Sequence, residues 1–411
     1  MNLDIPVYCG EEAIARLIDY CQSHRIDRFL LVSDSNTYAA LGQKVEADLR
    51  KREWDMRTVI LDGADVIADE KHIFEVLFHA HAEARMYLAV GSGTITDITR
   101  YASFCSRNDF ISLPTAPSVD AYTSVGAALT ISGFKNTVPC QVPAAVFAEL
   151  HTLCQAPRDM IAAGFGDVLG KYISLADWQL GHLLLGERYD ARVAGRLQRA
   201  LLSCVENAEA IGRGSRGGIA VLMEGLFESG LCMAEFGSSR PASGAEHIFS
   251  HFWEMKRTQE RRPAILHGIK VGFGTVLAAR RYEAIRSIGQ KEAISRLSSA
   301  SRPDMEDDIA RIRTAYGPVA DRIIADHRPF LENLEANFCA LKRKIGDYWP
   351  EIQDIAATVP PPVRIVQLLE SQTRLQAIDL DDRDVEQALQ SSHYLRGRFT
   401  VSTLGRVLGL W

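Results

Sequence analysis

The first part of the chain alternates short apolar runs with stretches whose apolar residues have helical spacing. The runs expected to be strands are Arg28–Ser33, Thr58–Leu61, Tyr87–Val90 and Phe110–Leu113. Strands separated by helices pair in parallel, and a parallel sheet needs helices on both of its faces. We therefore predict an α/β domain with a parallel, Rossmann-like sheet, whose ligands bind beyond the carboxyl ends of the strands.

Polar turns follow three of these runs, at the edge of the sheet where a ligand would bind. Asp34 follows the first run, Gly91–Asp97 the third, and Thr115–Ser118 the fourth. Glycine lets the backbone approach a pyrophosphate, and the helix after Thr94 directs its first N–H groups at such a group. Two such turns side by side indicate a nucleotide site, although each taken alone also fits an ordinary tight turn.

Asp34 has two interpretations. Its carboxylate would accept hydrogen bonds from an adenosine ribose, and its charge would repel the 2′-phosphate of NADP(H). It would serve equally well as the N-cap of the helix that follows. Under the first interpretation we expect NADH to be used at least as well as NADPH.

The remainder of the chain is almost free of strand signals. Its expected helices are Asp159–Gly181, Arg192–Gly212, Gly217–Glu235, Ala245–Met255, Lys270–Arg286 and Met305–Ala315. Lys135–Val138 is expected in a hairpin between Thr130–Ile131 and the apolar run Val142–Phe147, and Pro157-Arg158-Asp159 marks a break. We predict a dinucleotide-binding domain over residues 1–155 and an all-helical domain that binds metal and substrate over residues 156–411. The charged stretch Lys256–Arg262 is expected to be a solvated loop.

Composition restricts the compartment and the partners. The chain has 411 residues, a net charge of −6 and no basic block, which argues against nucleic acid and anionic membranes as partners. No apolar run reaches the length of about 18 residues that a membrane span needs, and the first residues lack the features of a signal peptide. The eight cysteines are scattered without a CxxC pair, as in proteins with reduced thiols. We expect a cytoplasmic protein without membrane insertion.

Three histidines fall within a short part of the helical region. His247 and His251 are one helical turn apart and would share a face, and His267 opens the next helix-like run. Asp167, upstream in GFGDVLGK, can complete a set of two imidazoles and one carboxylate, which leaves a divalent metal with open positions. The spacing alone is weak evidence, because a histidine is more often a surface or core residue than a ligand.

A nucleotide domain followed by a helical metal domain is typical of the dehydroquinate synthase-like superfamily, which includes metal-dependent polyol dehydrogenases. Within it, the chain resembles the sn-glycerol-1-phosphate dehydrogenases. The stretches that carry the resemblance are Gly91–Asp97, Pro114–Gly126, Gly164–Lys171, Met223–Gly230, Gly237–Met255 and Leu266–Gly268. The segment Tyr394–Leu410 also resembles the bacterial branch of that family.

The resemblance implies a role for each matching residue. One divalent ion of zinc, nickel or iron would be bound by Asp167, His247 and His267. Substrate contact and catalysis would fall to Asp120, Asp167 and His251. The nicotinamide cofactor, NAD(H) or NADP(H), would lie near Asp34 and contact Gly93, Thr94, Ile95, Thr96, Asp97, Thr115, Ala116, Pro117, Ser118 and Ser124. A homodimer is also expected.

The implied reaction is the reversible reduction of dihydroxyacetone phosphate to sn-glycerol 1-phosphate. The metal would polarise the C2 oxygen as a Lewis acid. His251 suits a proton relay, because a histidine ordinarily titrates near neutral pH, but a packing or outer-sphere role is the alternative. Candidates for binding the small substrate's phosphate are Lys171, Arg261 and Arg262.

Three other functions stay open at this stage. The first is a dehydrogenase of glycerol or another polyol, which would use dihydroxyacetone in place of its phosphate. The second is a cyclase or lyase like dehydroquinate synthase, which uses metal and NAD only transiently, so that net NADH consumption excludes it. The third is a non-catalytic relative that serves as a binding module, against which the complete ligand set argues.

Overall fold

The structure is a computed structural model, and it describes residues 5–63, 66–81, 83–131, 133–372 and 378–411. The chain forms two compact units. The first contains the residues up to Val168, Arg199–Ser239 and a short segment that includes Ser371. The second contains Leu169–Gln198, Arg240–Glu370 and the C-terminal segment to Trp411.

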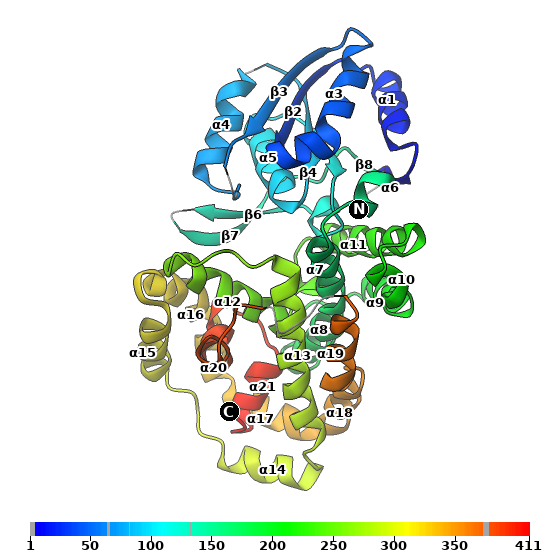
Figure 1. Ribbon diagram of the computed structural model, residues 1–411. Helices are drawn as coiled ribbons and strands as arrows, with labels where there is room; N and C mark the ends of the chain where they lie inside the picture. The colour runs from blue at the N-terminus through cyan, green and yellow to red at the C-terminus, as the bar shows by residue number, and fades with distance from the viewer. Residues whose placement is uncertain (1–4, 64–65, 82, 132, 373–377) are drawn as a thin grey trace. The chain divides into compact units, whose positions relative to one another are not determined.

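A six-stranded parallel sheet forms the centre of the first unit (Figure 1), in the order β1-β8-β5-β4-β2-β3. Its strands are β1 (Val7–Gly10), β2 (Arg28–Asp34), β3 (Asp55–Leu61), β4 (Met86–Gly91), β5 (Phe110–Pro114) and β8 (Ala145–Glu149). The parallel sheet and the helical region after it confirm the predicted fold class. The four expected strands are all present and slightly longer than expected.

Helices of the first unit cover both faces of this sheet. The helices of this unit are α1 (Ala13–Ser23), α2 (Ser35–Thr37), η1 (Tyr38–Gly42), α3 (Gln43–Arg50), α4 (Glu70–Ala80), α5 (Gly93–Cys105), η2 (Ala121–Thr123), α6 (Leu150–Cys154), α10 (Ala208–Gly212) and α11 (Arg216–Phe236), and those that form the layers on the sheet are mainly α1, α3, α4 and α5. On β2, Phe29 and Leu31 pack with α1 and α3, whereas Leu30 and Val32 pack with α4 and α5. Burial on both faces is why these strands are continuous apolar runs in the sequence.

The chain changes direction across the sheet between β2 and β4. From β2 it passes through α3 on one face to β3, and from β4 it passes through α5 on the opposite face to β5. The segments that leave β2 and β4 therefore separate to opposite faces. A parallel α/β sheet binds its ligand in the crevice at such a switch point. Asp34 ends β2 and Gly91 ends β4, so both lie at this point.

A hairpin is present as an antiparallel pair outside the main sheet, but its second strand is not the expected run Val142–Phe147, whose last residues belong to β8 of the parallel sheet. It consists of β6 (Gly126–Ile131) and β7 (Phe134–Pro139), with Thr130 opposite Lys135. Ala127 and Leu129 of β6 are buried in the hydrophobic layer of α4 and α5.

A single boundary near residue 155 does not reproduce the division into two units, because α11 is part of the first one. At its start, Arg216 forms an ion pair with Glu11 at 3.0 Å. Further along, the carbonyl oxygen of Phe227 accepts a 2.8 Å hydrogen bond from the Thr123 hydroxyl. The predicted assignment of dinucleotide and metal binding to residues 1–155 and 156–411 stays a prediction.

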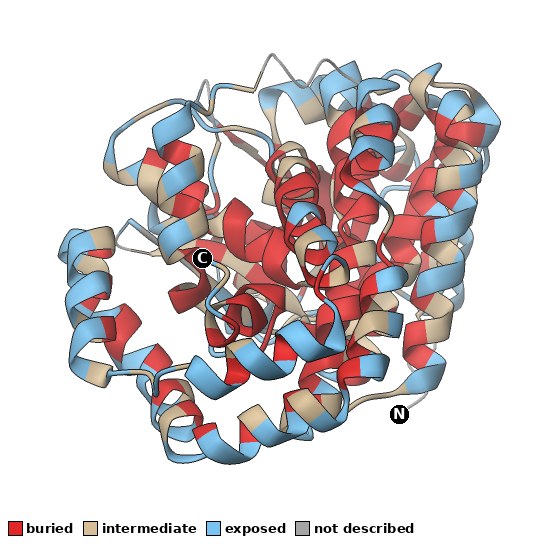
Figure 2. Cartoon of the chain, turned by 90° about the horizontal axis from the view of Figure 1, so that it is seen from below, coloured by how far each residue is buried: buried red, intermediate tan, exposed pale blue. Residues whose placement is uncertain are grey.

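The regular elements in the described residues of the second unit are all helices, which loops connect. Its elements are α8 (Lys171–Leu185), η3 (Arg240–Ala242), α12 (Ala245–Gln259), α13 (His267–Arg286), α14 (Gln290–Ser299), α15 (Met305–Tyr316), η4 (Gly317–Val319), α16 (Ala320–Ala336), α17 (Phe338–Asp347), α18 (Trp349–Ala357), α19 (Pro362–Glu370), α20 (Asp382–Ser391), η6 (Ser392–Leu395) and α21 (Val401–Val407). Two further helices, α7 (Arg158–Leu169) and α9 (Ala191–Glu206), run across the division. Figure 2 shows buried positions on the helix faces that turn toward other helices.

A buried carboxylate ties four helical segments of the second unit together. Asp177 of α8 accepts hydrogen bonds from the Ala245 backbone N–H at 2.7 Å, the Tyr282 hydroxyl at 2.6 Å and the Val401 backbone N–H at 2.8 Å. Burial raises the pKa of Asp177 to about 7. The starts of α12 and α21 are thereby fixed to the middle of α8.

The expectation that Lys256–Arg262 is a solvated loop is wrong, because α12 continues to Gln259. Arg257 is buried, and its guanidinium donates to the backbone oxygen of Pro263 at 2.8 Å and to a carboxylate oxygen of Asp379 at 2.8 Å. Partners that are distant in the sequence thus compensate the charge of Arg257.

None of the helices in the described part of the chain combines the length and apolar character that crossing a membrane requires.

Candidate active site

Three imidazole rings come together where α12 packs against α13. His247 and His251 lie one turn apart on α12, and His267 is the first residue of α13. The ring centroids are 5.3 Å apart for His247 and His267, 5.5 Å for His251 and His267, and 6.2 Å for His247 and His251. The expected histidine cluster is therefore present within the second unit.

Glu246 fixes the orientation of His247. Its Oε1 lies 2.7 Å from His247 Nδ1 and also accepts the Gly244 backbone N–H at 2.8 Å. A carboxylate only accepts hydrogen bonds, so Nδ1 carries the proton and Nε2 carries the lone pair that a metal needs. Gly244 makes this arrangement possible, because a Cβ there would lie 2.7 Å from Asp177 Oδ2 and 2.8 Å from Glu246 Oε2.

The side chains of Asp167, His247 and His267 fit a divalent metal ion. One carboxylate oxygen and one nitrogen from each imidazole all lie within 4.8 Å of one another. Asp167 is buried near the end of α7, and its Oδ2 accepts the Asp120 backbone N–H at 3.1 Å. Two imidazoles and a carboxylate suit zinc, nickel or iron(II). A buried carboxylate behind one ligand is the usual support of a metal-bound histidine.

A second group, formed by His251, Glu254 and His267, also offers ligand atoms within 4.8 Å of one another. Glu254 Oε2 lies 3.4 Å from His251 Nδ1, and its Oε1 lies 3.7 Å from the ammonium of Lys270, a buried residue. The lysine already compensates the Glu254 charge, which makes this carboxylate a poorer partner for a cation. The part of His251 in proton exchange stays a prediction.

The two polar turns of the first unit lie side by side, as predicted. β4 and β5 are neighbours in the sheet, and the Thr115 backbone N–H donates to the Gly91 carbonyl oxygen at 3.2 Å. Close packing requires glycine at position 91, since a Cβ there would lie 2.5 Å from Cβ of Ile95. Helix α5 begins at Gly93, and its N-cap Ser92 makes no capping bond through its side chain. The start of α5 can therefore direct N–H groups at a phosphate.

Asp34 is an N-cap in the structure, as its second interpretation proposed. Its Oδ1 accepts the Thr37 backbone N–H at 2.8 Å, and its own N–H donates to the Thr37 hydroxyl at 3.0 Å. A carboxylate has a second oxygen and more than one lone pair, so capping does not prevent a contact with a ribose. The cofactor role of Asp34 stays a prediction.

Two of the residues expected to contact the cofactor make internal contacts. Asp97 forms an ion pair at 2.9 Å with the fully buried Arg100, which also donates to the Ala121 carbonyl at 2.6 Å. Burial lowers the pKa of Arg100, and the Asp97 charge opposes this. Ser124 donates to the same Ala121 carbonyl at 3.1 Å. These bonds fix η2 against α5, and direct cofactor contact by Asp97 and Ser124 stays a prediction.

The other residues of the second turn are packed tightly. Ala116 and Ser118 are buried, and the Tyr122 hydroxyl lies between them, donating to the Ala116 carbonyl and lying 3.3 Å from the Ser118 hydroxyl. The Pro117 carbonyl would lie 1.8 Å from a Cβ at Gly164 of α7. This turn is therefore held in one conformation beside the start of α5. Thr94 and Ile95 of the first turn lie in the opening turn of α5, where Thr96 donates to the Ser92 carbonyl at 3.0 Å.

Comparison with known proteins decides the family. Residues 8–157 match the family model of iron-containing alcohol dehydrogenases. A glycerol-1-phosphate dehydrogenase [NAD(P)+] of Geobacillus thermodenitrificans is 36% identical over 403 residues, which cover 96% of this chain and 90% of that protein. The protein of the same name from Geobacillus stearothermophilus is 42% identical over 290 residues, covering 69% and 72%. The chain belongs to the glycerol-1-phosphate dehydrogenase family.

Solved structures support the fold of this family member independently of sequence. The alcohol dehydrogenase from Oenococcus oeni superposes with a TM-score of 0.61 at 13% identity, covering 97% of this chain and 94% of that one. At this identity the likeness concerns the fold alone.

Two polar residues beside the candidate site of this glycerol-1-phosphate dehydrogenase family member escaped prediction. Ser229 of α11 donates to Asp120 Oδ2 at 2.7 Å, and Glu246 supports His247. The signal for Glu246 was an acid directly before the first histidine. Nothing in the sequence pointed to Ser229, because its partner Asp120 is distant in the chain.

Two of the three residues considered for binding a phosphate, Arg262 and Lys171, have other partners. Arg262 donates to both carboxylate oxygens of Asp384, at 3.0 and 2.9 Å. Lys171 is buried, and its ammonium donates to the Ala242 carbonyl at 3.3 Å. Arg261 lies in the turn after α12 with a positive φ of 54°. The geometry therefore argues against Arg262 and Lys171 as the phosphate ligand, and the role of Arg261 stays a prediction.

Proposed function

We propose that the chain is an NAD(P)-dependent sn-glycerol-1-phosphate dehydrogenase, which reduces dihydroxyacetone phosphate and catalyses the reverse oxidation. The observation that carries this proposal is the convergence of Asp167, His247 and His267 in a member of this family. The family name supplies the substrate, and the residues present supply the groups that the reaction needs.

A divalent ion held by Asp167, His247 and His267 would polarise the C2 oxygen of the substrate. Glu246 keeps His247 in the tautomer that binds a cation, since it accepts the Nδ1 proton. Asp120 lies beside Asp167, to which its backbone N–H donates, and Ser229 holds the Asp120 carboxylate. These contacts support the proposal that Asp120 accepts a hydrogen bond from a substrate hydroxyl.

His251 is the residue that would exchange the proton. When hydride reaches C2 of dihydroxyacetone phosphate, the C2 oxygen gains a proton, and oxidation returns it. His251 shares the ligand-bearing part of α12, and its Nδ1 lies 3.4 Å from Glu254 Oε2, a carboxylate oxygen that can orient the ring as it exchanges a proton. Lys270 lies on the other oxygen of Glu254 and holds that carboxylate in place.

The hydride must come from a nicotinamide cofactor, because no amino-acid side chain donates hydride. The start of α5 and the Thr115–Ser118 turn would bind its pyrophosphate, and Asp34 would lie at its adenosine ribose. We also infer a cytoplasmic homodimer. The cysteines of the described residues are free thiols, as is usual in a reducing compartment. The proposal of a dimer rests on the family resemblance.

The deciding experiment measures NADH oxidation by the purified, metal-loaded protein with dihydroxyacetone phosphate, followed by chiral analysis of the product. We expect net NADH consumption and formation of sn-glycerol 1-phosphate. A higher kcat/KM with dihydroxyacetone would assign a polyol dehydrogenase instead, and turnover without net NADH consumption would assign a cyclase or lyase. Light scattering measures the oligomeric state.

A further inference from the structure

The second unit contains a large cavity away from the residues assigned above. Its volume is about 770 Å³, within the range of about 300–1,000 Å³ that small-molecule sites occupy. Residues of α12, α13, α15, α20, η6 and α21, together with Trp411, line it. None of the candidate metal, cofactor or substrate residues is among them.

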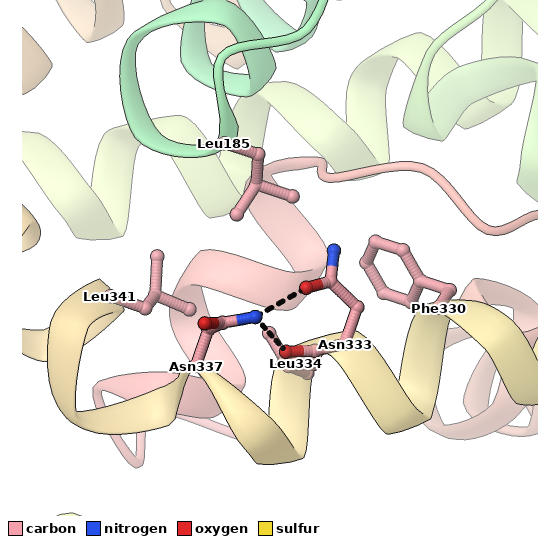
Figure 3. A pocket seen from close by; sticks show the side chains of 6 residues that line it. All are labelled: Leu185, Phe330, Asn333, Leu334, Asn337 and Leu341. Atoms are coloured by element: carbon pink, nitrogen blue, oxygen red, sulfur yellow. Dashed lines mark hydrogen bonds between the residues drawn. The ribbon is translucent and has the colours of Figure 1, made fainter.

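The cavity in Figure 3 is far smaller than the one described above. It measures about 10 Å³ and is lined by Leu185, Phe330, Asn333, Leu334, Asn337 and Leu341. Asn337 Nδ2 donates there to the backbone oxygen and the side-chain oxygen of Asn333, at 3.1 and 2.5 Å. Such a space holds about one water molecule and is an ordinary packing defect.

The wall of the large cavity is strongly cationic. No carboxylate is among its described lining residues. Five basic residues line it, namely Lys256, Arg280, Arg281, Arg311 and Arg406. Asp308, behind the wall, accepts from Arg406 at 2.8 Å. Asp177 also acts electrostatically on Arg281. Carboxylates therefore counter two of the five cations, Arg406 and Arg281.

The inner cations are held in place by the protein. Arg281 is buried, donates to the Ser402 hydroxyl and the Leu389 carbonyl, and lies with its guanidinium carbon 4.7 Å from the centre of the Trp411 ring. Lys256 donates to the Ala315 carbonyl at 3.1 Å. The pKa of His393, which also lines the cavity, is held well below its ordinary value. The main cause is burial, and nearby cations, including Arg406, Arg281 and Arg311, add to it. The surroundings therefore disfavour further positive charge.

The remaining wall is largely apolar. Phe252, Leu277, Val385, Leu389 and Trp411 contribute hydrophobic side chains to the same cavity. Arginine clusters suit phosphate groups, which accept several N–H donors at once. We propose that this cavity is a second ligand site, which binds a small organic phosphate with an apolar tail.

The position of the cavity gives its occupant access to the helix that carries the histidines. Phe252 lines the cavity and directly follows His251 on α12. The site is nevertheless chemically separate from the metal set, so binding requires neither metal nor nicotinamide cofactor. It can be measured whether or not the proposed dehydrogenase reaction is found.

The test is isothermal titration calorimetry of the full-length protein with octyl phosphate, in a chelating buffer and below the concentration at which the probe aggregates. We expect saturable binding of one molecule per chain. Inorganic phosphate and octanol should each bind at least roughly tenfold more weakly, since each lacks one half of the interaction. Absence of saturable binding, or equal affinity for inorganic phosphate, would overturn the proposal.

A double variant locates the binding. Arg280 and Arg311 are exposed residues that line the cavity. The double variant Arg280→Ala with Arg311→Ala should therefore leave packing intact and weaken the binding of octyl phosphate roughly tenfold or more. The matched control is Arg313→Ala on the same helix, whose exposed ion pair with Asp321 is 3.1 Å long and does not line the cavity. Unchanged affinity in the double variant, equal loss in the control, or displacement of the probe by dihydroxyacetone phosphate would each contradict the assignment. Circular dichroism verifies that all variants are folded.

Discussion

The polar turns of the first unit and the histidine cluster of the second unit are built from different groups. The turns rely on backbone atoms, such as the Thr115 N–H on the Gly91 carbonyl and the opening N–H groups of α5. The cluster relies on side chains that come from separate helices. Substitution of one side chain should therefore abolish the function of the cluster, whereas it should only adjust that of the turns.

The largest effect is expected at the metal ligands. His247→Ala removes one of three donors, so the purified variant should contain little metal and lose roughly 10³-fold or more in turnover. Elemental analysis and steady-state kinetics measure both quantities. The control His182→Ala changes an exposed histidine of α8 and should alter neither. Full metal occupancy in His247→Ala would remove this residue from the ligand set.

The next effect is expected at His251. His251→Ala should keep its metal and its affinity for NADH but lose roughly 10²–10⁴ in kcat, because a proton relay contributes about that much. His251→Asn should recover substrate binding better than rate, since asparagine forms hydrogen bonds but does not titrate. Metal loss in the alanine variant would make His251 a ligand. A lower melting temperature with near-normal kcat would make it a packing residue.

Acid should weaken the second unit through a buried histidine. Burial lowers the pKa of His327 from 6.5 to about 4. Between these values the unfolded chain binds the proton and the folded chain does not, so stability present above about pH 6.5 is lost as pH falls toward 4. The loss from this residue is about 3 kcal/mol at most. His327→Leu should flatten the dependence of melting temperature on pH in this range, and an unchanged slope would contradict the assignment.

A smaller effect is expected behind the ligands. Glu246→Gln keeps the shape of the side chain but removes the charge that holds the Nδ1 proton of His247. Metal affinity should fall roughly 10–100-fold, the usual cost of losing such a support. Competition with a fluorescent chelator measures it, and activity should return when excess metal is added. An affinity equal to that of the wild type would show that the ring is oriented by other contacts.

The smallest effect is expected at a strand-end turn. Asp34→Ser should raise kcat/KM for NADPH relative to NADH by roughly fivefold to tenfold, since one repulsive charge is removed near a 2′-phosphate. Serine still caps a helix, so the melting temperature should change little, whereas Asp34→Ala should lower stability by about 1 kcal/mol. A wild-type enzyme that strongly prefers NADPH would exclude the proposed role of Asp34.

The same contrast explains what could be predicted from the sequence. Strands such as Phe110–Pro114 were predictable because burial on both faces leaves a continuous apolar run. β1 was missed because Val7–Gly10 is a short, half-buried strand at the edge of the sheet. The histidine set was located through family resemblance, since its spacing alone did not distinguish it from ordinary histidines.

Long-range pairing accounts for features that no local sequence pattern shows. Arg257 looked solvated because Asp379, the carboxylate that compensates its charge, is far away in the sequence. The inclusion of α11 in the first unit depends on contacts such as that between Thr123 and Phe227, which no local pattern encodes. Asp34 shows the reverse case, since a local rule identified its capping role correctly.

The hydrogen bonds of Asp177 have a consequence for how such sequences can diverge. Two of its three donors are backbone N–H groups, those of Ala245 and Val401, and no substitution at those positions removes a backbone amide unless it introduces proline. Tyr282, the third donor, can be exchanged, but the two amides would still need an acceptor. Substitutions at neighbouring side chains can therefore accumulate as long as position 177 keeps a hydrogen-bond acceptor. Aligned relatives should vary more at position 282 than at position 177.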